Sequence, residues 1–253
     1  MLQDNLRPDT ETILPYDMVT LPSEGIFYAN KKKSVKVTYL NASDENLLAS
    51  QSLQGTGDLV NQLIIKKVLD KDINVADMPE CDKQAILIFL RNTAFGSDYT
   101  IQLTDPTTKE KFTANLDLSI LKTIDINVKI DEKNEFEFYL EKSKKKTKLK
   151  FLTPADNKEL IELNETHKKD SVSPYMTKQL EKMLVEIDGV RDRMTIAQFI
   201  QTMPIKDAQD IRKIVKNNTP ALDLNVTQKT PSGEEMKVGI SLGVEFFRPF
   251  YGL

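Results

Sequence analysis

The sequence predicts an α+β fold in which one unit occurs twice, each copy a small antiparallel sheet with two or three helices. Residues 78–84 share Met, Pro, Asp and Gln with residues 203–209 at the same relative positions. Residues 37–44 match 149–156 in the same way, with an alternating stretch followed by Leu and then Asp. Matches that keep their order along the chain indicate an internal duplication, and they lie among stretches with strand and helix periodicity.

Composition bounds the class of protein. The chain has 253 residues, which suits one large or two ordinary domains. Charged residues make up 29% and the net charge is -3, so nothing attracts the chain to nucleic acid in general. No apolar run is long enough to span a membrane, so no membrane contact is expected. One histidine and one cysteine exclude the usual zinc and iron–sulfur ligand sets, and we expect no cofactor and no small-molecule substrate.

The sequence predicts neither secretion nor an internal disulfide. It lacks the basic and apolar regions of a signal peptide, and a single cysteine cannot form an internal disulfide. The chain is therefore predicted to be cytosolic at synthesis.

We predict an extended N-terminal arm at 1–20, a first repeat at 21–122, a connector at 123–134 and a second repeat at 135–253. Prolines punctuate the arm, and a segment lying along another surface and a frayed terminus fit it equally well.

The first copy alternates between strand and helix patterns. Alternating residues indicate strands, apolar residues at spacings of three and four indicate helices, and Pro and Gly mark helix starts and ends. The predicted elements are, in order, a hairpin over 26–40 turned at 30–33, helices from Ser43, from Asp58 and from Pro79 to Gly96, and strands at 99–105 and 110–118.

The second copy follows the same order after an alternating connector strand at 124–130. Its predicted elements are strands at 136–140 and 147–152, helices at 154–167, 174–188 and 195–217, the last broken at Pro204, and strands at 221–228 and 236–243.

A lysine-rich turn in the second copy is the first candidate contact surface. Six lysines occur between Lys142 and Lys150, and Lys144, Lys145 and Lys146 are consecutive. A basic hairpin tip would touch an acidic partner, whereas nucleic acid is disfavoured because no aromatic residue interleaves at the tip. The alternative is a solvated turn in which lysine blocks edge-to-edge aggregation. Lysines at 31–33 occupy the matching place in the first copy.

An aromatic tail is the second candidate. The possible partner contacts are Phe246, Phe247, Arg248, Phe250 and Tyr251. Phe, Tyr and Arg are the residue types that anchor interfaces. The alternative is that these aromatics dock on their own domain and close its core.

Other reactive residues lack the context for catalysis. His167 lies at a predicted helix end and Cys81 at a helix start, where the second copy has Lys206 instead. The glycines at 55–57 are not followed by the Gly-Lys-Ser/Thr of a P-loop. No placed acidic pair is visible, so we predict that the protein is not an enzyme.

The order of several short motifs resembles a known family. The segments are Leu21–Tyr28, Met78-Pro79 with Asp82 and Leu90-Arg91, Phe95–Tyr99, Phe199–Asp207 and Phe246–Pro249. Together they resemble the baseplate hub protein family of T-even-like contractile-tailed bacteriophages, from about residue 15 to the end. The resemblance implies no catalytic residues.

This resemblance implies a structural or assembly component of the central hub of a phage tail baseplate, acting through protein–protein contacts. Its partners would be other phage tail and baseplate proteins. The protein would be located in the virion after assembly in the host cytoplasm. The alternative is a non-virion assembly chaperone that holds a tail or hub protein.

Overall fold

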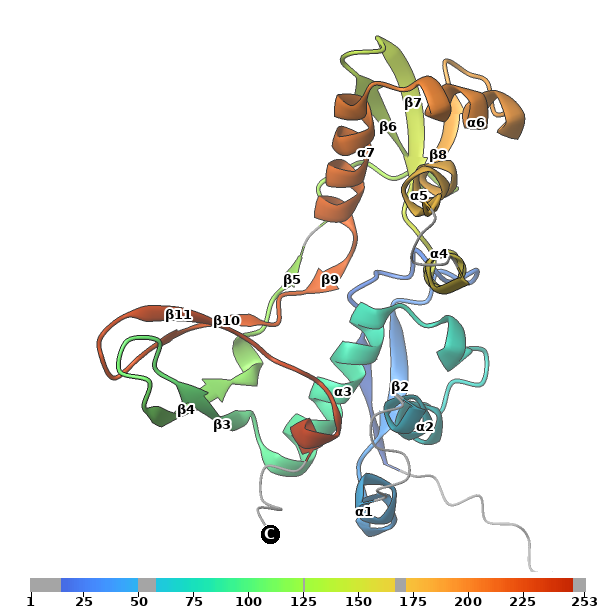
Figure 1. The fold of residues 1–253 in the computed structure, drawn as a ribbon. Helices are drawn as coiled ribbons and strands as arrows, with labels where there is room; N and C mark the ends of the chain where they lie inside the picture. Colours follow the sequence, from blue (N-terminus) through green and yellow to red (C-terminus); the bar gives the residue numbers. More distant parts are fainter. Residues whose placement is uncertain (1–14, 50–57, 125, 167–171, 248–253) are drawn as a thin grey trace, which may run out of the picture.

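The computed structural model describes residues 15–49, 58–124, 126–166 and 172–247. These residues form two stacked bodies, and two hairpins project to one side of the lower body (Figure 1). Helices pack on antiparallel sheets of two or three strands, which confirms the predicted α+β class.

The first body begins with a hairpin that starts earlier than predicted. β1 (Tyr16–Thr20) pairs antiparallel with β2 (Ser34–Thr38), so the last part of the predicted arm is a strand. The rest of the arm, 1–14, lies outside the described residues. The strand predicted at 26–28 is wrong, because these residues belong to a long turn. Gly25 holds a φ of 81° in this turn, which L side chains rarely adopt, and that tightens the chain there.

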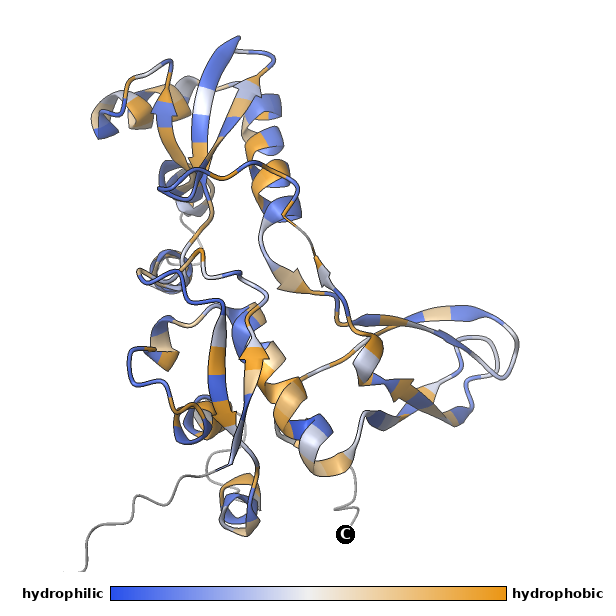
Figure 2. Cartoon of the chain, turned by 180° about the vertical axis from the view of Figure 1, so that it is seen from behind, coloured by the Kyte–Doolittle hydropathy of each residue, from blue (hydrophilic) through white to orange (hydrophobic). Residues whose placement is uncertain are grey.

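Helices cover one side of this hairpin. α1 (Ala42–Ala49) and α2 (Asp58–Lys67) precede α3 (Glu80–Phe95), which begins after Pro79 and ends at Gly96, as predicted. Most of α3 is hydrophobic where it lies against the strands (Figure 2). It is the central helix of the first core.

Two hairpins extend from the first body. They are β3 (Asp98–Thr104) with β4 (Lys111–Asp117), and β10 (Asn225–Lys229) with β11 (Glu235–Gly239). Exposed and covered residues alternate along both, so each buries one face. Their turns touch, because the Ser232 backbone N–H and hydroxyl donate to the Asp105 carboxylate, each at 3.0 Å.

The second body is a three-stranded sheet with helices. Its elements are β6 (Glu135–Leu140), β7 (Lys145–Lys150) and β8 (Leu184–Ile187) in the order β6-β7-β8, with α4 (Pro154–Thr166), α5 (Tyr175–Met183), α6 (Arg193–Thr202) and α7 (Ile205–Asn218). The break at Pro204 falls between α6 and α7, as predicted. The helix predicted at 174–188 is wrong at its end, because Leu184 pairs opposite Leu149 and the chain continues as a strand.

Two short strands join the bodies. β5 (Thr123–Ile124) pairs with β9 (Ala221–Leu222), so the two crossings between the bodies run side by side. The connector strand predicted at 124–130 is wrong beyond Ile124, since 126–130 is irregular. Its apolar side chains nevertheless pack on the second core, which explains their alternation.

The two hydrophobic cores divide the chain unevenly. All fully buried members of the second core lie between Phe136 and Val215. The first core combines residues 19–118 with a returning segment that includes Val238, Ile240, Phe246 and Phe247. The C-terminal hairpin, which we assigned to the second repeat, therefore packs on the first body.

The same order of elements nonetheless occurs twice. β1, β2, α1, α2 and α3 are followed by β6, β7, α4, α5 and α7. After α2, Val68 bridges Val37 of β2, just as β8 after α5 pairs with β7. The internal duplication stays a prediction, and this order agrees with it.

Candidate interaction surfaces

A buried aspartate in each half ties a hairpin turn to the start of a helix. In the first half, Asp82 accepts hydrogen bonds from the Ser23 backbone N–H at 2.9 Å, the Ser23 hydroxyl at 2.6 Å and the Tyr28 hydroxyl at 2.8 Å. In the second, Asp207 accepts from the Lys142 and Ser143 backbone N–H groups at 3.0 and 2.7 Å and from the Ser143 hydroxyl at 2.6 Å. These are the aspartates of the repeated Met-Pro motif.

The two carboxylates differ in electrostatics. Burial raises the pKa of Asp82, despite its hydrogen bonds. Burial also opposes ionisation at Asp207, but the hydrogen bonds from Ser143 and Lys142 outweigh it and lower the pKa. Both carboxylates lie in the first turn of a helix, where the dipole favours negative charge. The hydrogen bonds of both carboxylates join the hairpin turn to the helix and thus stabilise the fold.

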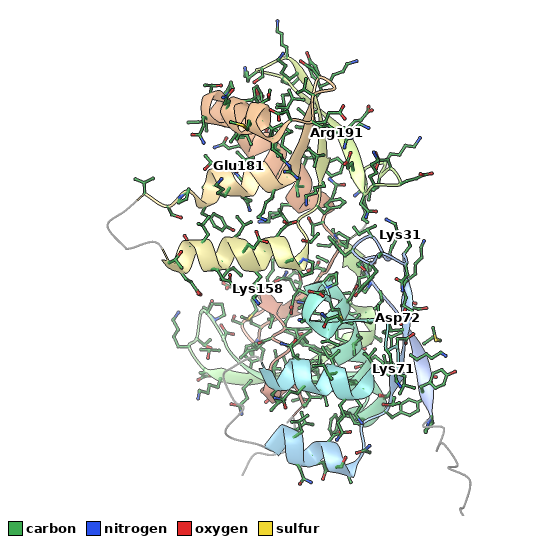
Figure 3. The ribbon with its side chains drawn as sticks, turned by 90° about the vertical axis from the view of Figure 1, so that its right-hand side faces the viewer. Lys31, Lys71, Asp72, Lys158, Glu181 and Arg191 are labelled. Atoms are coloured by element: carbon green, nitrogen blue, oxygen red, sulfur yellow. The ribbon has the colours of Figure 1, made fainter. Side chains whose placement is uncertain are left out.

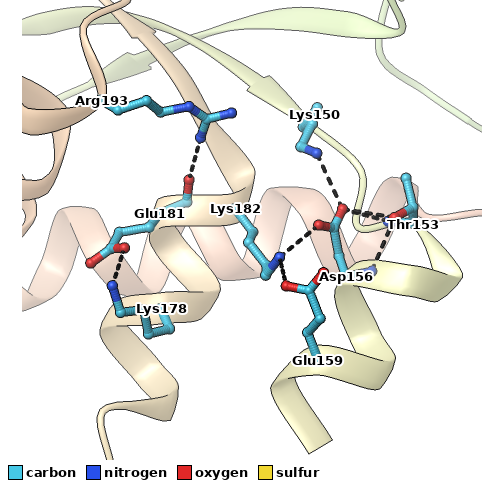
Figure 4. Close-up of polar contacts among 8 residues, drawn as sticks. All are labelled: Lys150, Thr153, Asp156, Glu159, Lys178, Glu181, Lys182 and Arg193. Carbon is cyan, nitrogen blue, oxygen red and sulfur yellow. Dashed lines mark hydrogen bonds and ion pairs between the residues drawn. The ribbon is translucent and has the colours of Figure 1, made fainter. Parts of the chain in front are cut away.

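A second pair of aspartates fixes the corner after each hairpin. Asp156 accepts from the Thr153 backbone N–H at 3.1 Å and its hydroxyl at 2.9 Å, and pairs with Lys150 at 3.1 Å and Lys182 at 3.0 Å (Figure 4). These contacts overcome partial burial and lower the pKa of Asp156 to about 2. Lys182 also reaches Glu159, at 2.6 Å.

Asp44 occupies the equivalent corner of the first half. It accepts from the Asn41 backbone N–H at 2.8 Å and pairs with Lys66 at 2.7 Å and with Lys67. An acidic side chain at the third helical position that bonds back to the cap N–H is one half of a capping box. The two corners therefore use the same chemistry, and the matches in the sequence had marked both aspartates.

The described residues contain no constellation typical of an active site. No group of three or more His, Cys, Asp or Glu side chains that could hold a metal occurs among them. Cys81 is buried, and burial followed by the charge of Asp82 raises the pKa of its thiol, which suits packing rather than nucleophilic attack. His167 lies outside the described residues. No described helix is both long enough and apolar enough to cross a membrane.

The lysine-rich turn is partly neutralised within the chain. Lys145 pairs with Asp188 at 2.7 Å, Lys148 with Asp131 at 3.7 Å, and Lys150 with Asp156. Lys144 and Lys146 are exposed and form no ion pair within the described part of the chain. The surface left for a partner is thus narrower than the sequence suggested.

The aromatic tail divides into a buried and an undescribed part. Phe246 and Phe247 are 0% and 1% exposed and belong to the first core. Phe246 packs edge-on against Tyr99, with ring centroids 5.2 Å apart, and Arg91 lies 5.5 Å from its ring. These two residues close the core of their own chain. Arg248, Phe250 and Tyr251 lie outside the described residues, and their role in partner binding stays a prediction.

Sequence reasoning missed the contact between the two bodies. Ile26 and Phe27 reach from the long β1–β2 turn onto the second core. Asn134 donates to the Ile26 carbonyl at 2.5 Å and accepts from Lys31 at 2.5 Å. The only pointer in the sequence was the apolar pair itself, which we read as a strand.

A groove of about 580 Å³ runs beside this contact. Its walls come from the start of α3, including Met78, Pro79 and Cys81, and from α4, including Asn157 and Ile161. Figure 3 shows α4 between α5 and the first body, with Lys158 at the side of the helix toward that body. The end of one half thus rests against the base of the other.

Comparison with protein families identifies the chain. The family model described as T4 bacteriophage base plate protein matches residues 18–248. The chain belongs to the T4 bacteriophage base plate protein family. No curated protein and no solved structure matches this base plate protein in the same comparisons. The family assigns it to the baseplate of a phage tail, a structural assembly, and agrees with the resemblance seen in the sequence.

Proposed function

We propose that this base plate family protein is a component of the central hub of the tail baseplate and acts through protein–protein contacts. The observation that carries the proposal is the family match over 18–248. The geometry is compatible with it, because the buried carboxylates of the described residues are used to hold turns and corners in place. Its partners would be other tail and baseplate proteins, met during assembly in the host cytoplasm.

The two halves would serve as two similar binding modules. This part of the proposal rests on duplication of one unit, which the repeated aspartate contacts support. Lys144 and Lys146 on the exposed turn, and Arg248, Phe250 and Tyr251 beyond the described core, are the proposed contacts with neighbouring subunits. The proposal includes no catalytic step, and a clear zone in peptidoglycan zymography with the purified protein would contradict it.

Quantitative mass spectrometry of purified virions tests the role. A fixed ratio to a known tail protein of the same particle would support a structural hub component. Absence from the virion, together with a stable soluble complex with one tail or hub protein in infected cells, would favour the assembly chaperone. If the protein is neither in the particle nor in any complex with tail proteins, both forms of the proposal fail.

A further inference from the structure

Each half of the protein has two different ends. At the turn end, the hairpin turn meets the start of α3 in the first half or α7 in the second, through Asp82 or Asp207. At the base end, the hairpin strands meet the start of α1 or α4, through Asp44 or Asp156. The two bodies are stacked so that the turn end of the first meets the base end of the second (Figure 1).

The turn end of the first half is covered by this stacking. Met78 is 1% and Cys81 5% exposed, and Pro79 between them is also buried; Met78 packs in the first core as well. All three line the groove shared with α4. Ile26, in the turn, is held by Asn134 at the base of the second half. The Met-Pro motif is therefore part of an internal interface.

The turn end of the second half carries the same motif uncovered. Ile205 is 75% exposed, Pro204 and Lys206 are exposed, and Met203 is only partly covered. Ile205 lies at the start of α7 with most of its side chain uncovered by the described chain, and the exposed Lys142, whose backbone N–H donates to Asp207, belongs to the same turn end. The contrast with the first half makes this end a candidate contact site, because Pro79 is buried there whereas the equivalent Pro204 is exposed.

Among the residues that the structure describes, none covers the base end of the first half either. Tyr16 is 39% and Tyr39 36% exposed, and Glu45 on α1 is exposed. Tyr39 donates a hydrogen bond to Asp17 at 2.7 Å. This end thus combines aromatic surface with side chains of both charges, since Lys36 lies over the Tyr16 ring and Lys66 pairs with Asp44, whereas the free turn end combines apolar surface with lysines.

The covered interface predicts which side chains would meet. Cys81 and Asn157 line the same groove. The position equivalent to Cys81 in the second half is Lys206, three residues into the repeated motif, and the position equivalent to Asn157 in the first half is Glu45, one residue after the corner aspartate. The two free ends therefore place Lys206, which pairs with Asp210 at 2.7 Å on its own helix, opposite Glu45, at the positions where the internal interface has Cys81 and Asn157.

We infer that the free turn end of the second half binds the free base end of the first half of another copy of this chain. The contact joins between chains the same two kinds of end that meet within one chain, with the short turn at 141–144 in place of the long turn that carries Ile26 and Phe27. Because it joins two different surfaces, it is heterologous and continues head to tail, closing into a ring or growing into a filament. The inference rests on the equivalence of the two halves and not on the hub role, so either can fail without the other.

Sedimentation velocity over a concentration series tests self-association. We expect the wild-type mass to rise with concentration, and association of Ile205→Asp to weaken by on the order of tenfold or more. Aspartate in the first turn favours the helix, so this variant keeps its fold. Ile120→Asp is the matched control, since Ile120 is also an exposed isoleucine, at 57%, and belongs to neither end, and it should associate like wild type. A wild-type chain that stays monomeric at every concentration overturns the inference.

Disulfide trapping tests the geometry. Lys206→Cys and Glu45→Cys variants, made in differently tagged chains and mixed under mild oxidation, should cross-link to each other. The native Cys81 is 5% exposed and should not compete. Cross-links that form only between two Lys206→Cys chains or only between two Glu45→Cys chains would indicate a symmetric dimer and overturn the head-to-tail contact.

Discussion

Replacing the two turn aspartates by asparagine should have unequal effects on stability. Asp82 and Asp207 occupy the same place in the repeated motif, but their donors differ. Two of the four donors to Asp82 are hydroxyl groups, from Ser23 and Tyr28; the other two are the Ser23 backbone N–H and the Cys81 thiol. A hydroxyl can rotate and accept a hydrogen bond from an amide, so an asparagine at 82 can keep every partner.

The backbone donors to Asp207 cannot reverse their hydrogen bonds in this way. Its two oxygens accept from two backbone N–H groups, those of Lys142 and Ser143. An asparagine has one oxygen, so one backbone N–H would face the amide NH₂ and lose its partner. A buried donor left unsatisfied costs about 1–3 kcal/mol. Because Asp207 is fully buried, we expect Asp207→Asn to lose about 2–3 kcal/mol of unfolding free energy.

The pKa directions point the same way. Burial raises the pKa of Asp82, so its charge is unfavourable there and a neutral amide removes that penalty. The lowered pKa of Asp207 means that its charge is stabilised. We therefore expect Asp82→Asn to lose less than about 1 kcal/mol.

Urea unfolding followed by circular dichroism at neutral pH measures both losses, and hydrogen exchange assigns them to the first or second body. Asp210→Asn is the control, because Asp210 pairs with Lys206 at the surface and an exposed i,i+4 pair contributes about 0.3–0.5 kcal/mol. Equal losses of unfolding free energy in Asp82→Asn and Asp207→Asn, or a larger loss in Asp82→Asn, would refute this explanation of the two aspartates.

Three further outcomes are expected. The pKa of Asp156, about 2, is depressed below its ordinary 3.8, so the stability it contributes is present above about pH 4 and lost as pH falls toward 2; urea midpoints across this range should drop less in Asp156→Asn than in wild type. Phe246→Ala should lose about 3–5 kcal/mol of unfolding free energy, whereas Tyr139→Ala, at a side chain that is 44% exposed, should change the urea midpoint little. Cys81 should react slowly with an aromatic disulfide reagent in the native protein and rapidly in urea; fast native labelling would contradict its burial.

Local patterns predicted much of the fold, and long-range pairing limited the rest. The Pro79 and Gly96 boundaries of α3 and the break at Pro204 follow from backbone chemistry that is independent of context. Residues 184–187 could continue a helix on local pattern, and only the neighbouring β7 makes them a strand. The position of β1 likewise depends on a partner strand beyond a long turn.

Surfaces were harder to predict than elements. The lysines near residue 145 stand out in the sequence, but the acidic partners that neutralise Lys145 and Lys148, Asp188 and Asp131, lie far along the chain on either side. Phe246 is of a residue type that often anchors interfaces, yet it is fully buried in the core of its own chain. Composition alone cannot separate these two states, since both are driven by removal of apolar area from water.

The return of the C-terminal hairpin to the first core has a consequence for synthesis on the ribosome. The second core needs only residues from 136 to 215 for its fully buried members, so it can close while later residues are still being added. The first core lacks Val238 and Phe246 until those late residues have emerged. The half that is translated first should therefore mature last, and a nascent chain stalled before residue 238 should carry a finished second body beside an unfinished first one.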